Sequence, residues 1–345
     1  MRYLLPEKGK FYKANLHCHS TLSDGSLTPE ELKKAYKENG YDILAITDHE
    51  YLVDHTDMTE PDFLMLNGYE LYVKDMSEPE LSRFYRTTHL NAIAKTPDVK
   101  KQIMVDPRYT KYAVRYGKIE DLPRVGEMCT RTYTPGCVNR MIKEANENGF
   151  LVFYNHPCWS REELSVITQY TGFMGMEIYN HGCFATEGYG TDDGQTYDTL
   201  LRMGRRLAVF ANDDNHNKYP FGDPLCDSFG GFNMIKAEEL TYEAVIAAIE
   251  KGDFYCSTGP TIEKLYMDGN VLHIECSPAR DIFLRTEPRN NAKGRSPHVG
   301  TKPGEVVTHA QFEIRPEDGY VRLEVVDHAG KKAFTRAYFM DELGM

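Results

Sequence analysis

The sequence predicts an α/β protein built on a parallel sheet or barrel, followed by a small all-β domain. Residues 1–259 alternate short apolar runs with stretches of helical periodicity, which is the pattern of repeated βα units. From 260 to 345, apolar and polar residues alternate in short runs broken by Gly, Pro and Asp, as in a sandwich-like domain. With 345 residues, 41% of them hydrophobic, the chain is long enough for one large core and one small core.

The first part shows seven apolar runs of strand length. They are 14–18, 43–47, 64–69, 151–154, 176–179, 207–211 and 254–257. The first helix has clear boundary signals, because Thr28 can cap it, Glu31 can complete a capping box and Gly40 can end it. Further helices are expected at 135–148, 161–170, 197–203 and 242–251. This order of elements favours βα units over a purely helical fold.

Residues 76–135 mix charged and aromatic side chains without a clean period. We interpret this segment as a partly helical insertion on one face of the barrel, where a substrate lid could lie; a surface excursion without a function explains it equally well. The all-β domain should contain strands at 271–276, 282–285, 311–314, 321–326 and 334–339.

Charge and cysteine content narrow the function classes. A formal net charge of −12 argues against non-specific binding of nucleic acid, which needs positive surfaces. The first ten residues lack the apolar core of a signal peptide, and no run of 18 apolar residues predicts a membrane span. The eight cysteines are scattered without a CxxC pair, which is typical of reduced thiols in a cytoplasmic protein.

Histidines and acids gather at the ends of the predicted strands. His17 and His19 are two residues apart, so both imidazoles should lie on one face of the strand, and Asp24 follows in the next loop. Later strand ends carry His49, Glu70, His156, Asp214 and His216. Barrels of this class keep their active sites at the C-terminal ends of the strands.

This grouping predicts a metal site, although each motif alone is weak and a single HxH often has a structural explanation. So many titratable groups in one covered site are costly unless cations compensate their desolvation and repulsion. Mixed imidazole and carboxylate ligands suit Zn²⁺, Mn²⁺ or Fe²⁺.

The ordered series HxH…SDG, TDH, a strand-end Glu, NHP and DxNH resembles the motifs of the polymerase-and-histidinol-phosphatase (PHP) family. The resemblance covers about residues 12–260, with 76–135 only partly included. Within the family the chain looks most like the carbaryl-hydrolase-like metallohydrolases, which carry a β-rich C-terminal domain. The resemblance implies a distorted (β/α)7 TIM-like barrel with a cluster of two or three divalent metal ions.

The resemblance further implies three ligand sets, two of which share Glu70. The first is His17, His19, Glu70 and Asp214, the second is Glu70, His89 and His156, and the third is Asp24, His49 and His216. No predicted strand precedes His89, so its assignment depends on the family's ligand-bearing segment. Some family members have His where Asp24 stands, so the third set would be more anionic here.

Two further residues have weaker claims to a role. Asp48 precedes His49 and is expected to support a ligand histidine; a salt bridge or a cap explains it equally well. His181 follows the fifth predicted strand and is a candidate general acid, against the alternative of a hydrogen-bonded loop histidine.

A metal cluster of this kind predicts a hydrolase. A water that bridges two ions becomes a hydroxide nucleophile near neutral pH, and a third ion, held by Asp24 and His216 among others, would polarise the substrate. Three dications favour an anionic substrate, hence a small phosphate monoester or diester. The competing hypotheses are a hydrolase of carboxylic esters, carbamates or amides, and a non-catalytic metal-binding module. The non-catalytic module fits these residues poorly, because structural metal sites usually have four ligands and a closed shell, whereas nine candidate ligands are present here.

Overall fold

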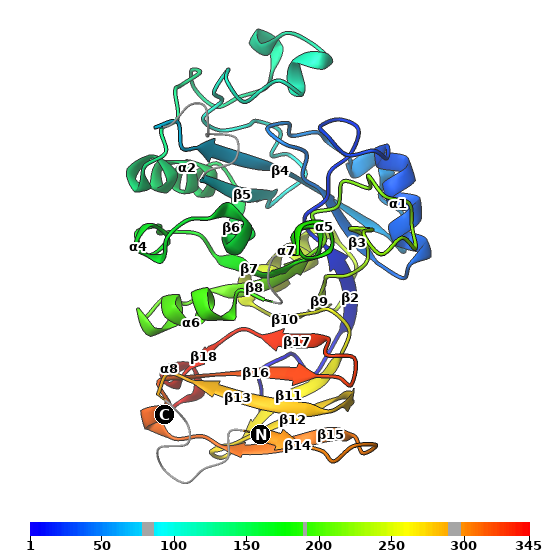
Figure 1. Ribbon diagram of the computed structural model, residues 1–345, viewed down its shortest axis with the longest axis vertical. Helices are drawn as coiled ribbons and strands as arrows, with labels where there is room; N and C mark the ends of the chain where they lie inside the picture. Colours follow the sequence, from blue (N-terminus) through cyan, green and yellow to red (C-terminus); the bar gives the residue numbers. More distant parts are fainter. Residues whose placement is uncertain (78–85, 189–191, 289–297) are drawn as a thin grey trace.

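The computed structural model describes residues 1–77, 86–188, 192–288 and 298–345. Figure 1 shows an α/β part above and a layered β part below, with both termini at the lower end. One fourteen-stranded mixed sheet runs through both parts, and a four-stranded sheet lies in the β part alone. The chain is therefore a mixed α/β protein.

The α/β part is built around two groups of parallel strands. The first group is β2 (Lys10–Asn15), β3 (Ile43–Ile46) and β4 (Leu64–Lys74); the second is β6 (Phe150–Tyr154), β7 (Gly175–Asn180) and β8 (Ala208–Asn212). Between them, β5 (Thr87–Ala94) is antiparallel to both β4 and β6. On the other side, β9 (Phe232–Ala237) is antiparallel to β2 and to β10 (Phe254–Ser257).

The structure does not show the expected distorted (β/α)7 TIM-like barrel as a closed ring, because its sheet is open. Among the described residues the paired strands run from β14 to β8 and do not return to close a ring. Where β8 approaches β9, the Asn233 side chain accepts from Ala211 N at 3.2 Å and donates to Ala211 O at 3.1 Å. The Asn233 side chain thus makes the hydrogen bonds to Ala211 that the backbone of a paired strand would otherwise make.

Two strands of the α/β part, β5 and β9, were not expected from the sequence. β5 lies inside 76–135, so this segment is not wholly an insertion. All eight residues of β5 are buried, including its Thr, His and Asn side chains. With both faces covered, the strand has no alternation of apolar and polar residues by which to be recognised.

The helices agree with the boundary signals in most places. α1 (Pro29–Glu38) has the expected capping box between Thr28 and Glu31. α2 (Pro135–Glu147), α6 (Gly194–Arg202) and α7 (Tyr242–Lys251) also form near their expected positions.

The single helix expected over 161–170 is wrong. Two short helices, α3 (Pro157–Ser160) and α4 (Leu164–Ile167), take its place, because the left-handed Arg161 (φ 57°) interrupts the helical path. Another short helix, α5 (His181–Glu187), was not expected. Single 3-10 turns occupy Thr56–Met58, Ala113–Arg115, Ile119–Asp121 and Pro316–Asp318.

The β part consists of two facing layers. The four-stranded sheet contains β1 (Arg2–Tyr3), β11 (Ile262–Asp268), β12 (Val271–Ala279) and β15 (Val307–Glu313). The other layer contains β14 (His298–Gly300), β13 (Asp281–Thr286), β16 (Tyr320–Val326), β17 (Lys332–Thr335) and β18 (Tyr338–Phe339), followed by α8 (Met340–Leu343). Side chains from both sheets share one core, as in a sandwich. Because β17 pairs with β10, this layer continues into the α/β part.

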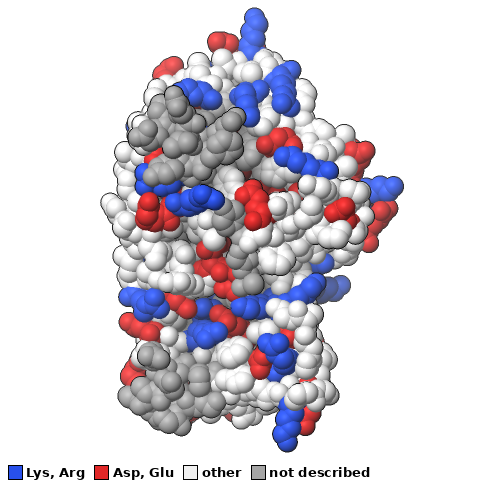
Figure 2. All heavy atoms as spheres, in the orientation of Figure 1, with Lys and Arg blue, Asp and Glu red and all other residues white. Residues whose placement is uncertain are grey.

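Surface charge and cysteine state add to this description. On the face shown in Figure 2, positive and negative side chains lie interspersed over the described surface. All eight cysteines fall within described residues, and all are free thiols. No helix in the described ranges is both long enough and apolar enough to span a bilayer.

Candidate metal centre

The chain after β2 and the chain after β8 lie side by side and bring four of the expected ligands together. Asp214 N donates to His17 O at 2.9 Å, and His19 N donates to Asn215 O at 3.0 Å. Asp214 itself adopts a left-handed backbone conformation (φ 51°). These bonds fix the two segments in register, with the side chains facing one another.

The first expected ligand set forms a buried cluster. Asp214 Oδ1 lies 3.0 Å from Nε2 of both His17 and His19, so the two imidazoles do share one face. Glu70 Oε1 lies 3.3 Å from His17 Nε2. Both histidines and Glu70 are inaccessible to solvent.

The second set meets the first at Glu70. Its Oε1 lies 2.9 Å from His89 Nδ1 and 3.4 Å from His156 Nε2. Glu70 is not at a strand end, as expected, but inside the eleven-residue β4. Tyr72 pairs with His89 in the antiparallel β4–β5 ladder, so Glu70 and His89 are diagonal neighbours on one face. The unexpected strand β5 therefore positions His89.

The third set lies nearer the surface. Asp24 Oδ1 is 3.4 Å from His216 Nε2 and 3.7 Å from His49 Nε2. His19 also belongs to this group, since one ligand atom from each of the four residues lies within 4.8 Å of all the others. The His19 ring lies 4.3 Å from that of His49 and 4.4 Å from that of His216, between centroids. His19 thus connects the first set to the third.

Unpartnered polar atoms show that this cluster fits cations. Asp24 Oδ1, His49 Nδ1 and Glu70 Oε2 are buried without a hydrogen-bond partner. His49 Nδ1 and Glu70 Oε2 are only 2.7 Å apart, yet the pair does not satisfy hydrogen-bond geometry. Buried polar atoms without partners are costly, and divalent ions would satisfy them with the imidazole and carboxylate donors that such ions prefer.

The electrostatics of the cluster keep its carboxylates ionised. Burial alone would raise the pKa of Glu70, but His89, His17 and His49 outweigh it and hold the pKa well below its usual value. Burial lowers the pKa of His89 to about 4, against the attraction of Glu70. At neutral pH, Glu70 is therefore anionic and His89 is neutral, which are the forms that bind a metal.

Sequence reasoning missed Glu177, which lies inside the wholly buried end of β7. Its Oε1 lies 2.8 Å from His17 Nδ1, and its Oε2 accepts from His156 N at 3.0 Å. A carboxylate in this position orients the imidazole and leaves Nε2 free for a metal. An acid in the apolar run GMEIYN was the available signal.

Asp48 supports the loop after His19 rather than His49. Its carboxylate accepts from Ser20 N at 2.8 Å, from Ser20 Oγ at 2.6 Å and from Ser23 Oγ. Ser23 Oγ lies 3.4 Å from His19 Nδ1. The structure therefore connects Asp48 with His19, another of the expected ligands.

His181 lies outside the pocket that the expected ligands surround. Its Nδ1 is 2.8 Å from Tyr179 Oη, and its ring stacks on Tyr179 and Phe184. The neighbouring Gly182 and Cys183 line the pocket instead. The geometry does not bring His181 to the cluster.

Part of the 76–135 segment covers the third set. Tyr112 Oη donates to Asp24 Oδ2 at 2.9 Å, and its ring stacks on His49 at 6.2 Å between centroids. Tyr116 Oη donates to Thr21 O at 3.1 Å. Tyr112 thus occupies one oxygen of Asp24 and leaves Oδ1 available. The sequence offered no signal for this contact beyond the aromatic content of the segment.

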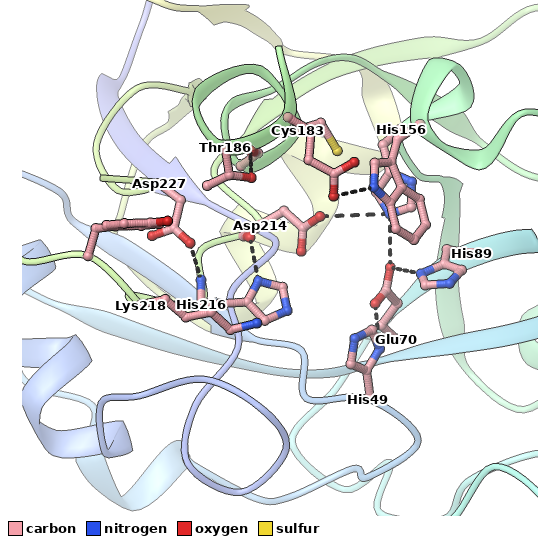
Figure 3. A pocket seen from close by; sticks show the side chains of 14 residues that line it. His49, Glu70, His89, His156, Cys183, Thr186, Asp214, His216, Lys218 and Asp227 are labelled. Carbon is pink, nitrogen blue, oxygen red and sulfur yellow. Dashed lines mark hydrogen bonds and ion pairs between the residues drawn. The ribbon is translucent and has the colours of Figure 1, made fainter. Parts of the chain in front are cut away.

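A pocket of about 400 Å³ opens over the cluster. Figure 3 shows His49, His89 and His156 turned toward Glu70, with His216 and Lys218 across the pocket from His89. The lining beyond the expected ligands is Trp159, Gly182, Cys183, Thr186, Glu187, Lys218, Tyr219 and Asp227. The cluster therefore opens into a cavity large enough for a small substrate.

Comparison with known proteins gives one sequence match and several structural ones. Residues 15–109 match the PHP domain model, and no curated protein matches the chain. A two-domain protein from Bacteroides vulgatus, containing a predicted PHP-like metal-dependent phosphoesterase, shares 15% identity over 98% of both chains with a TM-score of 0.45. An amidohydrolase from Chromobacterium violaceum with bound sulfate shares 16% identity, with 62% of this chain and 93% of that chain covered and a TM-score of 0.38.

The PHP match lies on the segment that carries most of the cluster. Of the nine expected ligands, His156, Asp214 and His216 follow residue 109, and the other six precede it. Residues 15–109 are thus similar to the PHP domain, and this stretch supplies six of the nine side chains gathered at the candidate metal centre.

Proposed function

We propose that the protein is a metal-dependent phosphoesterase that hydrolyses a small phosphate monoester or diester. The observation that carries this proposal is the environment of Glu70. Five imidazoles lie within 3.5 Å of its carboxylate oxygens, those of His17, His19, His49, His89 and His156. Its Oε2 is nevertheless without a hydrogen bond. A buried carboxylate that is surrounded by imidazoles and keeps an unpartnered oxygen is the arrangement expected of a ligand that bridges two cations.

The three expected ligand sets would together hold two or three divalent ions, Zn²⁺, Mn²⁺ or Fe²⁺. Bound ions would polarise the phosphoryl group and lower the pKa of the attacking water. The chain's own residues would position these ligands: Glu177 orients His17, and Tyr112 holds one oxygen of Asp24. Asp24, Glu70 and His216 would therefore serve catalysis as ligands at the reacting centre.

An anionic phosphate ester suits this site better than a neutral ester. Several dications in one pocket attract negative charge, and a phosphoryl group offers oxygens that can contact more than one ion. The PHP match at residues 15–109 agrees with this choice. Membership of the carbaryl-hydrolase-like branch, which would favour carbon esters and amides, is proposed only from the β-rich C-terminal part.

The same proposal divides the chain into a metallohydrolase part (1–259) and a β-rich part (260–345). It also gives part of 76–135 the role of a lid. Tyr112 and Tyr116 support the lid, since they contact the loop that carries Asp24. The eight free thiols support a cytoplasmic location.

The test compares an aryl phosphate with the corresponding aryl acetate on Mn²⁺-loaded protein. We expect phosphate ester hydrolysis that is lost on chelation and inhibited by inorganic phosphate. Glu70→Gln should lower kcat by at least about a hundredfold, because a bridging ligand acts on two ions at once. Glu147→Gln on the exposed end of α2 is the matched control. Acetate hydrolysis that inorganic phosphate does not inhibit, without phosphatase activity, contradicts the proposal.

A further inference from the structure

Three charged side chains line the pocket in addition to the proposed ligands: Glu187, Lys218 and Asp227. Two of them have partners within the protein. Asp227 accepts from the backbone of His216 at 2.6 Å and of Asn217 at 3.0 Å, and Glu187 accepts from Trp159 Nε1 at 3.0 Å. Lys218 makes no ion pair with any acid in the part of the chain that the structure describes. Figure 3 shows it beside His216.

The backbone that carries Lys218 is fixed although its side chain is exposed. The preceding Asn217 is buried in a left-handed conformation (φ 54°). Its side chain donates to Ser228 Oγ at 2.7 Å and accepts from Asn215 Nδ2 at 2.6 Å. Asparagine adopts this conformation more readily than most residues, and these hydrogen bonds hold it there. Here these contacts, with those of Asp227, direct the next residue toward the pocket.

Lys218 is poorly placed to bind the phosphoryl group that would be hydrolysed. That group would lie against the ions, and His216 belongs to the third ligand set. An ammonium group placed against these ions would be repelled by them. The four-carbon stem instead allows the ammonium to reach a different part of a bound substrate.

We propose that Lys218 binds a second anionic group of the substrate, a phosphate or a carboxylate separate from the phosphoryl group that is hydrolysed. The inference rests on the proposed function, because it takes the metal cluster as the binding site of the first group. It names the substrate class as small phosphate esters with an additional negative charge on the leaving group. Lys218 is then a residue that determines specificity.

The single tryptophan of the chain supplies a binding signal that does not depend on turnover. Trp159 lines the pocket, and its ring centroid lies 4.8 Å from that of His156 and 5.3 Å from that of His89. Its fluorescence should change when a ligand enters the pocket. The probes are methylphosphonate, which has one anionic group, and 3-phosphonopropionate, which adds a carboxylate.

On Mn²⁺-loaded wild type, 3-phosphonopropionate should bind about tenfold more tightly than methylphosphonate, the size of one hydrogen bond between charged groups. Lys218→Met should abolish this preference and leave methylphosphonate binding unchanged, whereas Lys218→Arg should retain most of it. Lys8→Met, at an exposed lysine that does not line the pocket, should behave as wild type.

Equal binding of the two probes to the wild type overturns the inference. So does an equal loss of both in Lys218→Met, since the lysine would then hold the group bound by the metals. Both outcomes leave the proposed function intact. Failure of the metal-loaded wild type to bind either probe contradicts the proposed function, and the inference falls with it.

Discussion

Glu177 Oε1 lies 2.8 Å from Nδ1 of His17, so the imidazole is held from the side opposite its proposed metal-binding nitrogen. Asp214 Oδ1 lies 3.0 Å from Nε2 of the same ring. The contact between Glu177 and His17 joins a carboxylate on β7 to the segment after β2, and the two residues are 160 positions apart in the chain. The metal cluster therefore depends on side chains beyond the ligands themselves.

Glu177→Gln should weaken metal binding by about ten- to a hundredfold while the fold is retained, because an amide orients the imidazole less strongly than a carboxylate. Competition with a fluorescent chelator measures the affinity, and circular dichroism checks the fold. Unchanged affinity would show that Glu177 only fills space in the core. Glu147→Gln serves as the surface control.

Asp24→Ala should remove one ion and leave the others in place, lowering the content from about three ions to about two. Asp24 is the only carboxylate of the third set, whose charge is lighter than that of the first set with its two acids, so we expect the third ion to be the weakest bound. Turnover should fall more than substrate binding if this ion acts on charge that develops in the transition state. Elemental analysis beside steady-state kinetics provides the measurement. A wild type that never exceeds two ions in excess metal contradicts the assignment of the third set.

Tyr112→Phe should weaken retention of this ion by several-fold without abolishing it, because it removes one hydrogen bond to Asp24 worth about 1 kcal/mol. Its effect should be smaller than that of Asp24→Ala and should be absent when Asp24 is already replaced. A double-mutant cycle on metal affinity tests this coupling. Additive losses would mean that the tyrosine acts elsewhere.

Arg322→Ala should destabilise the fold by about 3 kcal/mol, because the half-buried Asp198 loses its arginine partner and the buried Glu324 keeps only Arg285. Arg322 is buried in β16, donates to Asp198 of α6 at 2.7 and 2.9 Å, and pairs with Glu324 at 2.7 Å. It thus ties the β part to the α/β part. Urea unfolding measures the change, and a loss below about 0.5 kcal/mol, as at an ordinary surface site, would contradict this role.

Local signals in the sequence account for much of the fold, and long-range pairing accounts for the rest. Thr28 and Glu31 form the expected capping box because both partners lie within one helical turn. β5 gave no signal, since a strand buried on both faces has no alternation and an antiparallel insertion breaks the βα pattern. The open sheet in place of the expected TIM-like barrel could not be predicted for the same reason, because strand direction depends on pairing that no local motif reports.

For the candidate site, too, local motifs could be recognised in the sequence and long-range contacts could not. The order of the His, Asp and Glu motifs named nine side chains as candidate ligands, and the structure gathers all nine around one pocket and the cluster beneath it. Their binding of metal stays a prediction. Glu177 and Tyr112 could not be found in this way. They act through contacts with His17 and Asp24, which are distant from them in the chain. Such contacts become visible only after folding.

The most direct test of the account is the metal content of Glu70→Gln after loading with Mn²⁺ and removal of excess ions. Glu70 contacts both the first and second ligand sets, so its replacement should lower the content by more than one ion per chain, while Glu147→Gln keeps the wild-type content. A folded Glu70→Gln variant that retains every ion would contradict the bridging role of Glu70, and a wild type that binds no ion after loading would contradict the proposed metal centre.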